Sequence, residues 1–251
     1  MKAMRTYYEK VANLLKKVEE EEENVAKAAK LVSEAIEMDR LIHVFGTGGH
    51  SYIAAEETFW RAGGLVPINP IFDPGVSLSH GGARSSMIER LPGYAKPILE
   101  YYQVKKDDVI IIVNAYGINS VTIDATIESK KIGAKVIAIT SPEFSKVVPP
   151  DYPARHPSKK SLFELKEVDV VIDCHMPPGD AVVEIEGFSQ KVAPVSTILN
   201  AFVLNSIVAC TVENLVKKGL TPPVWMSANM PGGDEANKKY IEKYFERIKH
   251  L

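Results

Sequence analysis

The sequence predicts an α/β protein built on a doubly wound, five-stranded parallel sheet of order 2-1-3-4-5, with an N-terminal helical segment. Short apolar runs alternate with helix-length segments along the chain, which is the pattern of repeated βαβ units. The runs are continuously apolar, as expected when helices cover both faces of a parallel sheet. Two of them end in polar, glycine-containing turns. These observations together favour a doubly wound sheet with a ligand site at its edge.

The composition is that of a globular protein and excludes several functional classes. The chain has 251 residues, of which 45% are hydrophobic and 25% charged, so it can bury a sizeable core. A net charge of −2 gives no broad attraction to nucleic acid or to a membrane. The start of the chain is charged rather than signal-like, and we expect no apolar run of the roughly 20 residues that span a bilayer. Cys174 and Cys210 lie in apolar runs, which indicates reduced core cysteines and a cytoplasmic protein.

We expect three segments within one structural domain. Residues 1–40 form the N-terminal helical segment, residues 41–222 hold the sheet, and residues 223–251 hold a polar turn and a final charged helix. Between positions 6 and 38 there is no Gly or Pro, and apolar residues recur at helical spacing, which suits one amphipathic helix or a bent pair. The acidic run at 19–23 is expected to be solvated.

The first predicted strand, residues 41–45, runs into a glycine-rich loop at residues 46–51, which we call the glycine loop. Its three glycines let the backbone turn sharply and approach a ligand closely. The helix that begins near Ser51 would direct its free N–H groups at that ligand, which favours an anion such as phosphate. A tight connection without any ligand would give the same pattern.

A dinucleotide site is the main rival interpretation of the glycine loop. Ser51 stands where the third glycine of the dinucleotide fingerprint should be. The next predicted strand, residues 65–68, runs into Asn69 and Pro70 rather than into an acidic residue that could bind a ribose hydroxyl. We therefore expect no NAD cofactor and favour a phosphate site lined by hydroxyl groups.

The rest of the chain continues the alternation. A long polar connection at 69–93 is expected to form a wall or lid of the site, since loops of this length in compact domains are usually functional or disordered. Further predicted elements are a strand at 109–113, a polar turn at 114–120, a helix to 131 closed by Gly133, strands at 134–140 and 168–173, a short edge extension at 181–185, and an apolar helix at 194–218. In a 2-1-3-4-5 sheet the order reverses between the first and third strands, where ligands bind. The glycine loop and the turn at 114–120, which we call the second turn, should meet there.

With these two turns the chain resembles the SIS, or sugar isomerase, phosphosugar-binding family. The resemblance covers roughly residues 25–218 and rests on VFGTGGHS, on DVIIIVNAYGINSVTIDATIESKKIGAKVIAITS, and on VDVVID followed by PVSTILNAFVLN. The whole chain is most similar to small single-domain SIS proteins marked by FGTGxHS, EExFxRAGG, SxxxERLPGYA and GGDEAN, and more distantly to phosphoheptose isomerase. The resemblance implies a homo-oligomer, a homodimer or homotetramer, that binds a sugar phosphate. We expect no nucleic-acid partner, no membrane contact and no cofactor.

The resemblance also implies which residues hold the ligand. The phosphosugar-binding candidates are Gly46, Thr47, Gly48, His50, Ser51, Asn114, Tyr116, Gly117, Asn119 and Ser120. Ser51 matches the serine of the family's first loop. Only Gly117 is kept from the family's SxSGxT pattern in the second turn, where Asn114, Tyr116 and Asn119 replace hydroxyl residues. Asparagine side chains, Ser120 and backbone N–H groups can still donate hydrogen bonds there.

Aldose–ketose isomerisation requires a carboxylate that moves a proton between adjacent carbons and an acid that helps to open the sugar ring. Glu57 is the first candidate base, because the resemblance places it at the second glutamate of the AEE motif of phosphoheptose isomerase, with Glu56 beside it. We expect Glu57 to share an apolar helix face with Ile53 and Trp60, a setting that suits a general base. Both glutamates could instead pair with Arg61 or with a neighbouring subunit.

Other residues could supply the missing acid or the base. The helix histidine of phosphoheptose isomerase has no counterpart at 197–205, so His50 or His80 would have to substitute. Glu89 follows the second strand, as does the base of the related glucosamine-phosphate synthase isomerase domain. His43 is expected to be a core histidine.

The remaining patterns exclude other chemistry. Cys174 and His175 lack the spacing of a zinc site, and no nucleophile-elbow motif supports a hydrolase. We therefore expect no metal. The favoured function is a phosphosugar isomerase, and the alternatives are a phosphosugar-binding protein without turnover and a sugar-phosphate lyase or etherase.

Overall fold

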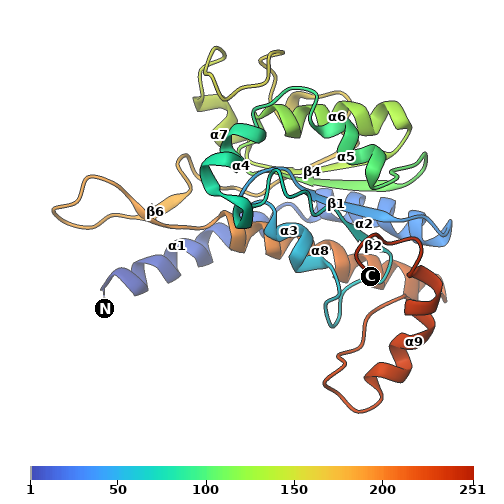
Figure 1. Ribbon diagram of the computed structural model, residues 1–251. Helices are drawn as coiled ribbons and strands as arrows, with labels where there is room; N and C mark the ends of the chain where they lie inside the picture. The colour runs from blue at the N-terminus through green and yellow to red at the C-terminus, as the bar shows by residue number, and fades with distance from the viewer. Residues whose placement is uncertain (1) are drawn as a thin grey trace.

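The five predicted parallel strands form the central sheet of the computed structural model, which describes residues 2–251 (Figure 1). They are β1 (Ile42–Gly46), β2 (Ile68–Pro70), β3 (Val109–Val113), β4 (Lys135–Thr140) and β5 (Val170–Asp173). Their order is β2-β1-β3-β4-β5, and all neighbouring pairs are parallel. The predicted sheet and strand order are confirmed. Gly46 is level with Val113 in the register of β1 and β3, so the glycine loop and the second turn leave the sheet side by side.

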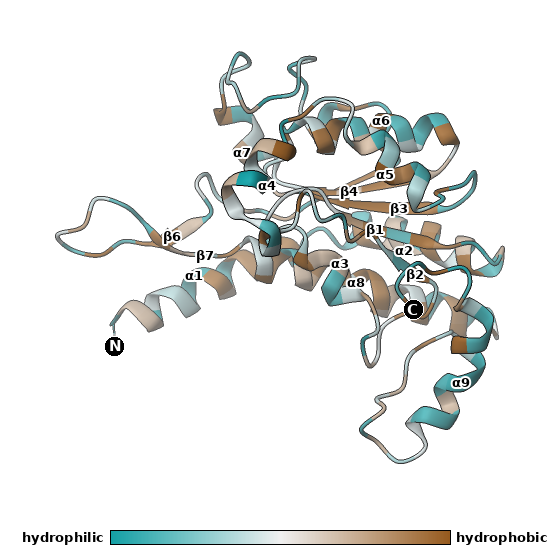
Figure 2. Ribbon diagram, in the orientation of Figure 1, coloured by the Kyte–Doolittle hydropathy of each residue, from teal (hydrophilic) through white to brown (hydrophobic). Residues whose placement is uncertain are grey.

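Helices cover both faces of this sheet, as Figure 2 shows by the brown strands enclosed between them. One face is covered by α2 (Glu22–Glu37), α3 (Ile53–Thr58) and α8 (Ser196–Lys217), and the other by α5 (Ala95–Tyr101) and α6 (Ser120–Ile132). Strand residues alternate between the two cores. Val44 and Ile111 belong to the core under α2 and α8, whereas Ile110 and Ile112 belong to the core under α5 and α6.

The N-terminal segment is the predicted bent pair of helices. Helix α1 (Lys2–Glu19) and α2 are separated by a break at Glu20 and Glu21. Helix α1 extends away from the sheet beside a small hairpin (Figure 1), and the Tyr7 hydroxyl donates to the carbonyl of Pro194 at 2.7 Å. The acidic run is exposed except at Glu21, which is half-buried.

Two strand predictions are wrong. Residues 181–185 do not extend the sheet edge, because β6 (Ala181–Val183) pairs antiparallel with β7 (Val192–Pro194) in a separate two-stranded sheet. Strand β2 begins at Ile68 rather than at 65. Leu65 instead forms an antiparallel bridge with Val224, and the N–H of Val66 donates to the carbonyl of Pro223. The C-terminal segment therefore pairs with Leu65 and Val66, where the strand was predicted to begin.

Helix α8 also departs from expectation. By length and composition alone it is apolar enough to span a membrane, whereas we expected no such run in the sequence. One face of α8 packs on α2 and α3, and its Leu199, Val203, Leu204 and Ile207 lie in the core. The packing of a core helix explains this composition.

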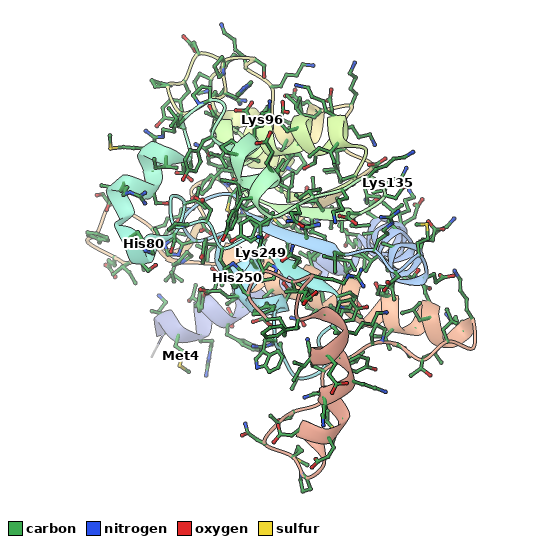
Figure 3. All side chains as sticks on the ribbon, turned by 45° about the vertical axis from the view of Figure 1, so that its right-hand side comes forward. Met4, His80, Lys96, Lys135, Lys249 and His250 are labelled. Carbon is green, nitrogen blue, oxygen red and sulfur yellow. The ribbon has the colours of Figure 1, made fainter. Side chains whose placement is uncertain are left out.

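Shorter helices and the C-terminal segment complete the fold. The shorter helices are η1 (Leu78–His80), α4 (Gly82–Ile88), α7 (Pro142–Val147) and η2 (Leu162–Glu164). The last helix, α9 (Gly233–Tyr244), precedes a tail that returns to β2, where Lys249 and His250 lie (Figure 3). The N–H of Lys249 donates to Asn69 Oδ1 at 3.1 Å. His43 is a buried core histidine, as predicted, with Nε2 3.1 Å from Asp108 Oδ2.

Candidate functional site

The glycine loop closes tightly over the carboxyl end of β1. A Cβ atom at Gly46 would lie 1.8 Å from the carbonyl oxygen of Ser51, so only glycine fits there. The N–H of Thr47 donates to the carbonyl of Val113 at 3.2 Å, and the N–H of Tyr52 donates to the carbonyl of Gly48 at 2.9 Å. These bonds fix both ends of the loop.

The backbone N–H groups between those two bonds are free. Those of Gly48, Gly49, His50 and Ser51 have no hydrogen-bond acceptor among residues 2–251. Consecutive unpaired N–H groups in a tight turn form a concave, positively polarised surface that binds anions. The glycine loop thus has the donors of an anion site.

The second turn is tied to the glycine loop by buried side chains. Asn114 Oδ1 accepts a hydrogen bond from the N–H of Gly117 at 2.9 Å, and Asn114 Nδ2 donates to Thr47 Oγ1 at 3.2 Å. Thr47 Oγ1 also lies 2.7 Å from Thr122 Oγ1 on α6. All three side chains are buried. Thr47 and Asn114, both predicted to bind the ligand, therefore join the two turns to each other.

The other predicted ligands in the second turn face the protein interior, apart from Tyr116. Asn119 and Ser120 are buried, and Asn119 Nδ2 donates to the carbonyl of Ala154 at 3.3 Å. Gly117 has φ +62°, and a Cβ there would lie 2.4 Å from Thr140 Oγ1. Tyr116 is 37% exposed; burial, together with the charges of Asp180 and Glu89, raises the pKa of its hydroxyl.

Glu89 lies where the two turns meet. A Cβ at Gly48 would be 2.5 Å from Glu89 Oε2 and 3.1 Å from Asn114 Nδ2, so the carboxylate lies directly over the glycine loop. Glu89 follows α4, and its carbonyl accepts the N–H of Val121 in the first turn of α6 at 3.0 Å. The backbone of Glu89 is thereby fixed to the element that follows the second turn.

The charge state of Glu89 is set by burial. Desolvation raises the pKa of its carboxyl from 4.5 to about 7, with a smaller opposing effect from the charge of Arg90. Among residues 2–251 its carboxylate has no hydrogen-bond donor or ion-pair partner. A carboxylate with a pKa near the working pH is suited to take up and release a proton.

Glu57, the first candidate from the sequence, is engaged elsewhere. Its Oε1 accepts a hydrogen bond from Asn205 Nδ2 of α8 at 3.0 Å and lies 3.1 Å from Arg61 Nε. Helix α3 ends at Thr58, and Trp60 lies beyond it with φ +50°. The predicted apolar helix face shared by Glu57 and Trp60 is therefore wrong, and the pairing with Arg61 is present.

A cleft of about 220 Å³ opens beside the glycine loop, between the first turn of α3 and η1. Its lining residues are Gly49, His50, Tyr52, Ile53, Glu56, Ser77, Leu78 and Ser79. His50 and Glu56 are exposed and line this cleft. His80 is also exposed, at the outer end of η1 (Figure 3), with Nδ1 3.1 Å from Ser79 Oγ. Part of the long connection at 69–93 thus lies against the loop as a wall.

The ionisable and sulfur-containing side chains do not form a metal site. Within residues 2–251 no group of three or more His, Cys, Asp or Glu side chains is placed to hold a metal ion. Cys174 and Cys210 are both free. Burial raises the pKa of the Cys174 thiol to about 12, so it stays protonated and unreactive at neutral pH.

Sequence reasoning missed the role of Asp180. Its Oδ1 accepts the N–H groups of Val195 and Ser196 at 2.9 and 2.8 Å, and its Oδ2 accepts the Ser196 hydroxyl at 2.7 Å. The carboxylate thus occupies the N-terminus of α8, an attractive place for an anion. The signal in the sequence was the pair Gly179-Asp180, which is typical of a turn. In the structure both residues have positive φ, +85° and +66°.

Comparisons with known proteins agree with this architecture. The family model described as SIS domain matches residues 6–141. The UPF0309 protein of Geobacillus thermodenitrificans is 42% identical over 243 residues, covering 96% of this chain and 95% of the relative. The UPF0309 protein of Shouchella clausii is 41% identical over 253 residues, and the alignment covers 100% of both chains.

Solved structures share the fold at lower identity. A phosphoheptose isomerase from Neisseria gonorrhoeae has a TM-score of 0.56 and 15% identity, with 84% of this chain and 97% of that chain covered. A phosphoheptose isomerase from Francisella tularensis has a TM-score of 0.54 and 14% identity, with 84% and 96% covered. Identities this low relate the folds and leave the chemistry to the site residues.

Proposed function

The chain belongs to the SIS-domain family, and on this premise we propose that it binds a phosphorylated sugar or amino sugar and interconverts its aldose and ketose forms by general acid–base catalysis. The observation that carries the proposal is Glu89. Its carboxylate lies directly over Gly48 and has a pKa raised to about 7, and four successive N–H groups of the same loop have no acceptor among residues 2–251. An anion site beside a proton-accepting carboxylate is what this reaction requires.

The phosphate is proposed to bind at the glycine loop alone. The N–H groups of Gly49, His50 and Ser51 are free to donate, and hydrogen bonds to a charged acceptor are stronger than neutral ones. The side chains of Asn114 and Asn119 in the second turn are committed to contacts inside the protein. The second turn would then shape the site without touching the phosphate.

In the proposed mechanism Glu89 is the base and Glu57 is not. The ionised carboxylate of Glu89 removes the C2 proton of the opened aldose, and the electron pair forms the C1=C2 bond while the C1 carbonyl becomes an enediolate oxygen. The proton of the C2 hydroxyl passes to O1, the C2 carbonyl forms, and Glu89 returns its proton to C1, which completes the ketose. His50, which lines the cleft, is proposed to protonate the ring oxygen during opening. Glu57 is held by Arg61 and Asn205, which favours a structural role.

One observation favours the alternative of binding without turnover. The second turn is closed by its own hydrogen bonds, and helix α8 provides no histidine at 197–205. A protein that senses a sugar phosphate would need the glycine loop and the cleft but no acid on that helix.

We also propose that the protein is a cytoplasmic homodimer or homotetramer. The outer faces of α1 and α8 expose large apolar side chains, namely Met4, Tyr8, Ile198 and Phe202. Met4 lies at the far end of α1, away from the sheet (Figure 3). Exposed apolar patches of this kind commonly mark contacts between proteins. Size-exclusion chromatography with light scattering measures the oligomeric state, and a monomer at micromolar concentration would contradict the proposed oligomer.

The function is tested by incubating the protein with a panel of sugar phosphates in deuterated water. NMR follows the exchange of the C2 proton and the appearance of the ketose. Exchange with at least one sugar supports isomerisation, whereas binding without exchange supports the sensing alternative. We propose that the Ser51 hydroxyl donates to the phosphate beside the loop N–H groups, so Ser51→Ala is expected to weaken sugar-phosphate binding by roughly tenfold, the effect of one lost hydrogen bond to a charged group. Unchanged affinity would mean that this hydroxyl does not contact the phosphate.

A further inference from the structure

A second cavity lies outside the parallel sheet, where the connection after α3 meets the segment before α9. Its volume is about 260 Å³. Both tryptophans of the chain meet there, with the ring centroids of Trp60 and Trp225 4.6 Å apart and the rings tilted by 56°. We propose that this cavity is a separate binding site for an uncharged sugar ring, which stacks on Trp60.

The floor of the cavity is rigid. Trp225 is 4% exposed. Its backbone N–H donates to the carbonyl of Gly64 at 3.0 Å, and its backbone carbonyl accepts the N–H of Gly63 at 2.9 Å. The side-chain amide of Asn237 binds both backbone groups of Met226, at 3.0 and 2.8 Å. A ligand would therefore meet a preformed surface, which lowers the entropic cost of binding.

The GGDEAN stretch serves this cavity rather than the glycine loop. A Cβ at Gly233 would lie 2.1 Å from the carbonyl oxygen of Ser227, so the first turn of α9 packs directly against the segment that lines the cavity. Asn237, the last residue of the stretch, is buried beneath Met226. The motif thus builds the cavity wall from the C-terminal segment.

Trp60 is presented rather than buried. Half of its surface is exposed, and its backbone has φ +50°, a conformation that is costly for a residue with a Cβ. A strained backbone at an aromatic residue that is only half-buried is the kind of strain that occurs at ligand sites. Core packing alone does not explain its position.

The lining of the cavity selects the chemistry of the ligand. It contains no ionisable side chain, which excludes a bound phosphate or strong charge. Beside the two indole rings and Met226 it offers the hydroxyl of Ser227 and the exposed amide of Asn229. A sugar ring matches this surface, since it has an apolar C–H face and a rim of hydroxyl groups. The volume is below the roughly 300–1,000 Å³ of drug-sized sites, which fits one ring.

This cavity is separate from the proposed phosphosugar site. Ile53 and Glu56 of α3 line the cleft beside the glycine loop, whereas Trp60 lies past the other end of that helix. No residue lines both cavities. Occupancy of one does not require occupancy of the other.

Tryptophan fluorescence tests the proposal directly, because both tryptophans line this one cavity. The full chain is titrated with methyl glucoside, methyl galactoside and N-acetylglucosamine, with inorganic phosphate as the charged control. The expected result is a saturable change in emission with at least one neutral sugar and none with phosphate. If no neutral sugar changes the emission, or only phosphate does, the proposal is overturned.

Variants separate stacking from other effects. Trp60→Ala retains Trp225 as the reporter and is expected to weaken sugar binding by at least about tenfold, the order of one stacking contact. Tyr8→Ala removes an exposed aromatic ring on α1 and should leave binding unchanged, as should Ser51→Ala. Glycine suits the positive φ at this position, so Trp60→Gly should fold normally and still lack the indole ring. Loss of sugar binding in a folded Trp60→Gly protein then shows that binding is not lost through unfolding.

Two further results would overturn the proposal. One is unaltered sugar affinity in Trp60→Ala, and the other is emission that changes with protein concentration alone, which would mean that a second copy of the chain covers the cavity. Neither result bears on C2 proton exchange, which tests the phosphosugar function independently.

Discussion

Replacing Glu89 with glutamine should stabilise the protein at alkaline pH while removing its proposed chemistry. The folded-state pKa of Glu89 is raised from 4.5 to about 7, so the folded protein retains a proton that the unfolded chain has already lost. This linkage stabilises the wild type below the unfolded value and is lost as pH rises through the folded value. Glutamine carries no charge at any pH, so the variant is free of this loss.

The magnitude follows from the size of the shift. A pKa change of one unit corresponds to about 1.4 kcal/mol, so between about pH 5 and pH 9 the wild type should lose roughly 2–3 kcal/mol of unfolding free energy relative to Glu89→Gln. For a chain of this length the loss corresponds to a difference in Tm on the order of 5–10 °C.

Thermal or urea unfolding of both proteins at a series of pH values measures this difference. Glu57→Gln is the matched control, because Glu57 is a partly exposed ion-pair partner of Arg61 and should show no stabilisation that grows with pH. If the stability difference between wild type and Glu89→Gln were the same at pH 5 and pH 9, the half-buried carboxyl of Glu89 would not have a raised pKa.

Three further substitutions probe the geometry around Glu89. Gly48→Ala places a Cβ 2.5 Å from Glu89 Oε2 and should displace the carboxylate, lowering C2 exchange by about tenfold or more with little change in Tm; unchanged exchange would contradict the placement. Asn114→Ala leaves the N–H of Gly117 without its acceptor and should cost about 1–3 kcal/mol in urea unfolding, and a neutral result would mean the turn is held otherwise. Asp180→Ala removes the cap of α8 and should cost about 0.5–2 kcal/mol; Asp180→Asn, which keeps an acceptor, should recover much of the loss.

Local patterns in the sequence were sufficient for the sheet and the two turns. Strands β1 and β3 are continuously buried, apolar apart from His43, and end in a glycine loop and a polar turn, so both their type and the reversal between them are encoded over short stretches. Helix α5 gave no such signal, because it has only seven residues and contains Pro97. Strand β2 was misplaced because its neighbour Val66 pairs with the distant Pro223.

The sequence ranked Glu57 first as the candidate base and Glu89 behind it, because the motif carries no information on burial and pairing, which are tertiary properties. In the fold, Glu57 meets Arg61 and Asn205, whereas the carboxylate of Glu89 over Gly48 has no partner within residues 2–251. The amide of Asn114 looked like a ligand for the same reason, since its use by Thr47 depends on the approach of two separate strands.

The most direct measurement is C2 proton exchange in deuterated water, compared for the wild type, Glu89→Gln and Glu57→Gln over a range of pH. If Glu89 is the base, exchange by the wild type rises with pH to a plateau with a midpoint near the pKa of about 7. Glu89→Gln then loses on the order of 10²-fold or more, whereas Glu57→Gln keeps most of its activity. Exchange that survives in Glu89→Gln and disappears in Glu57→Gln would contradict the central claim.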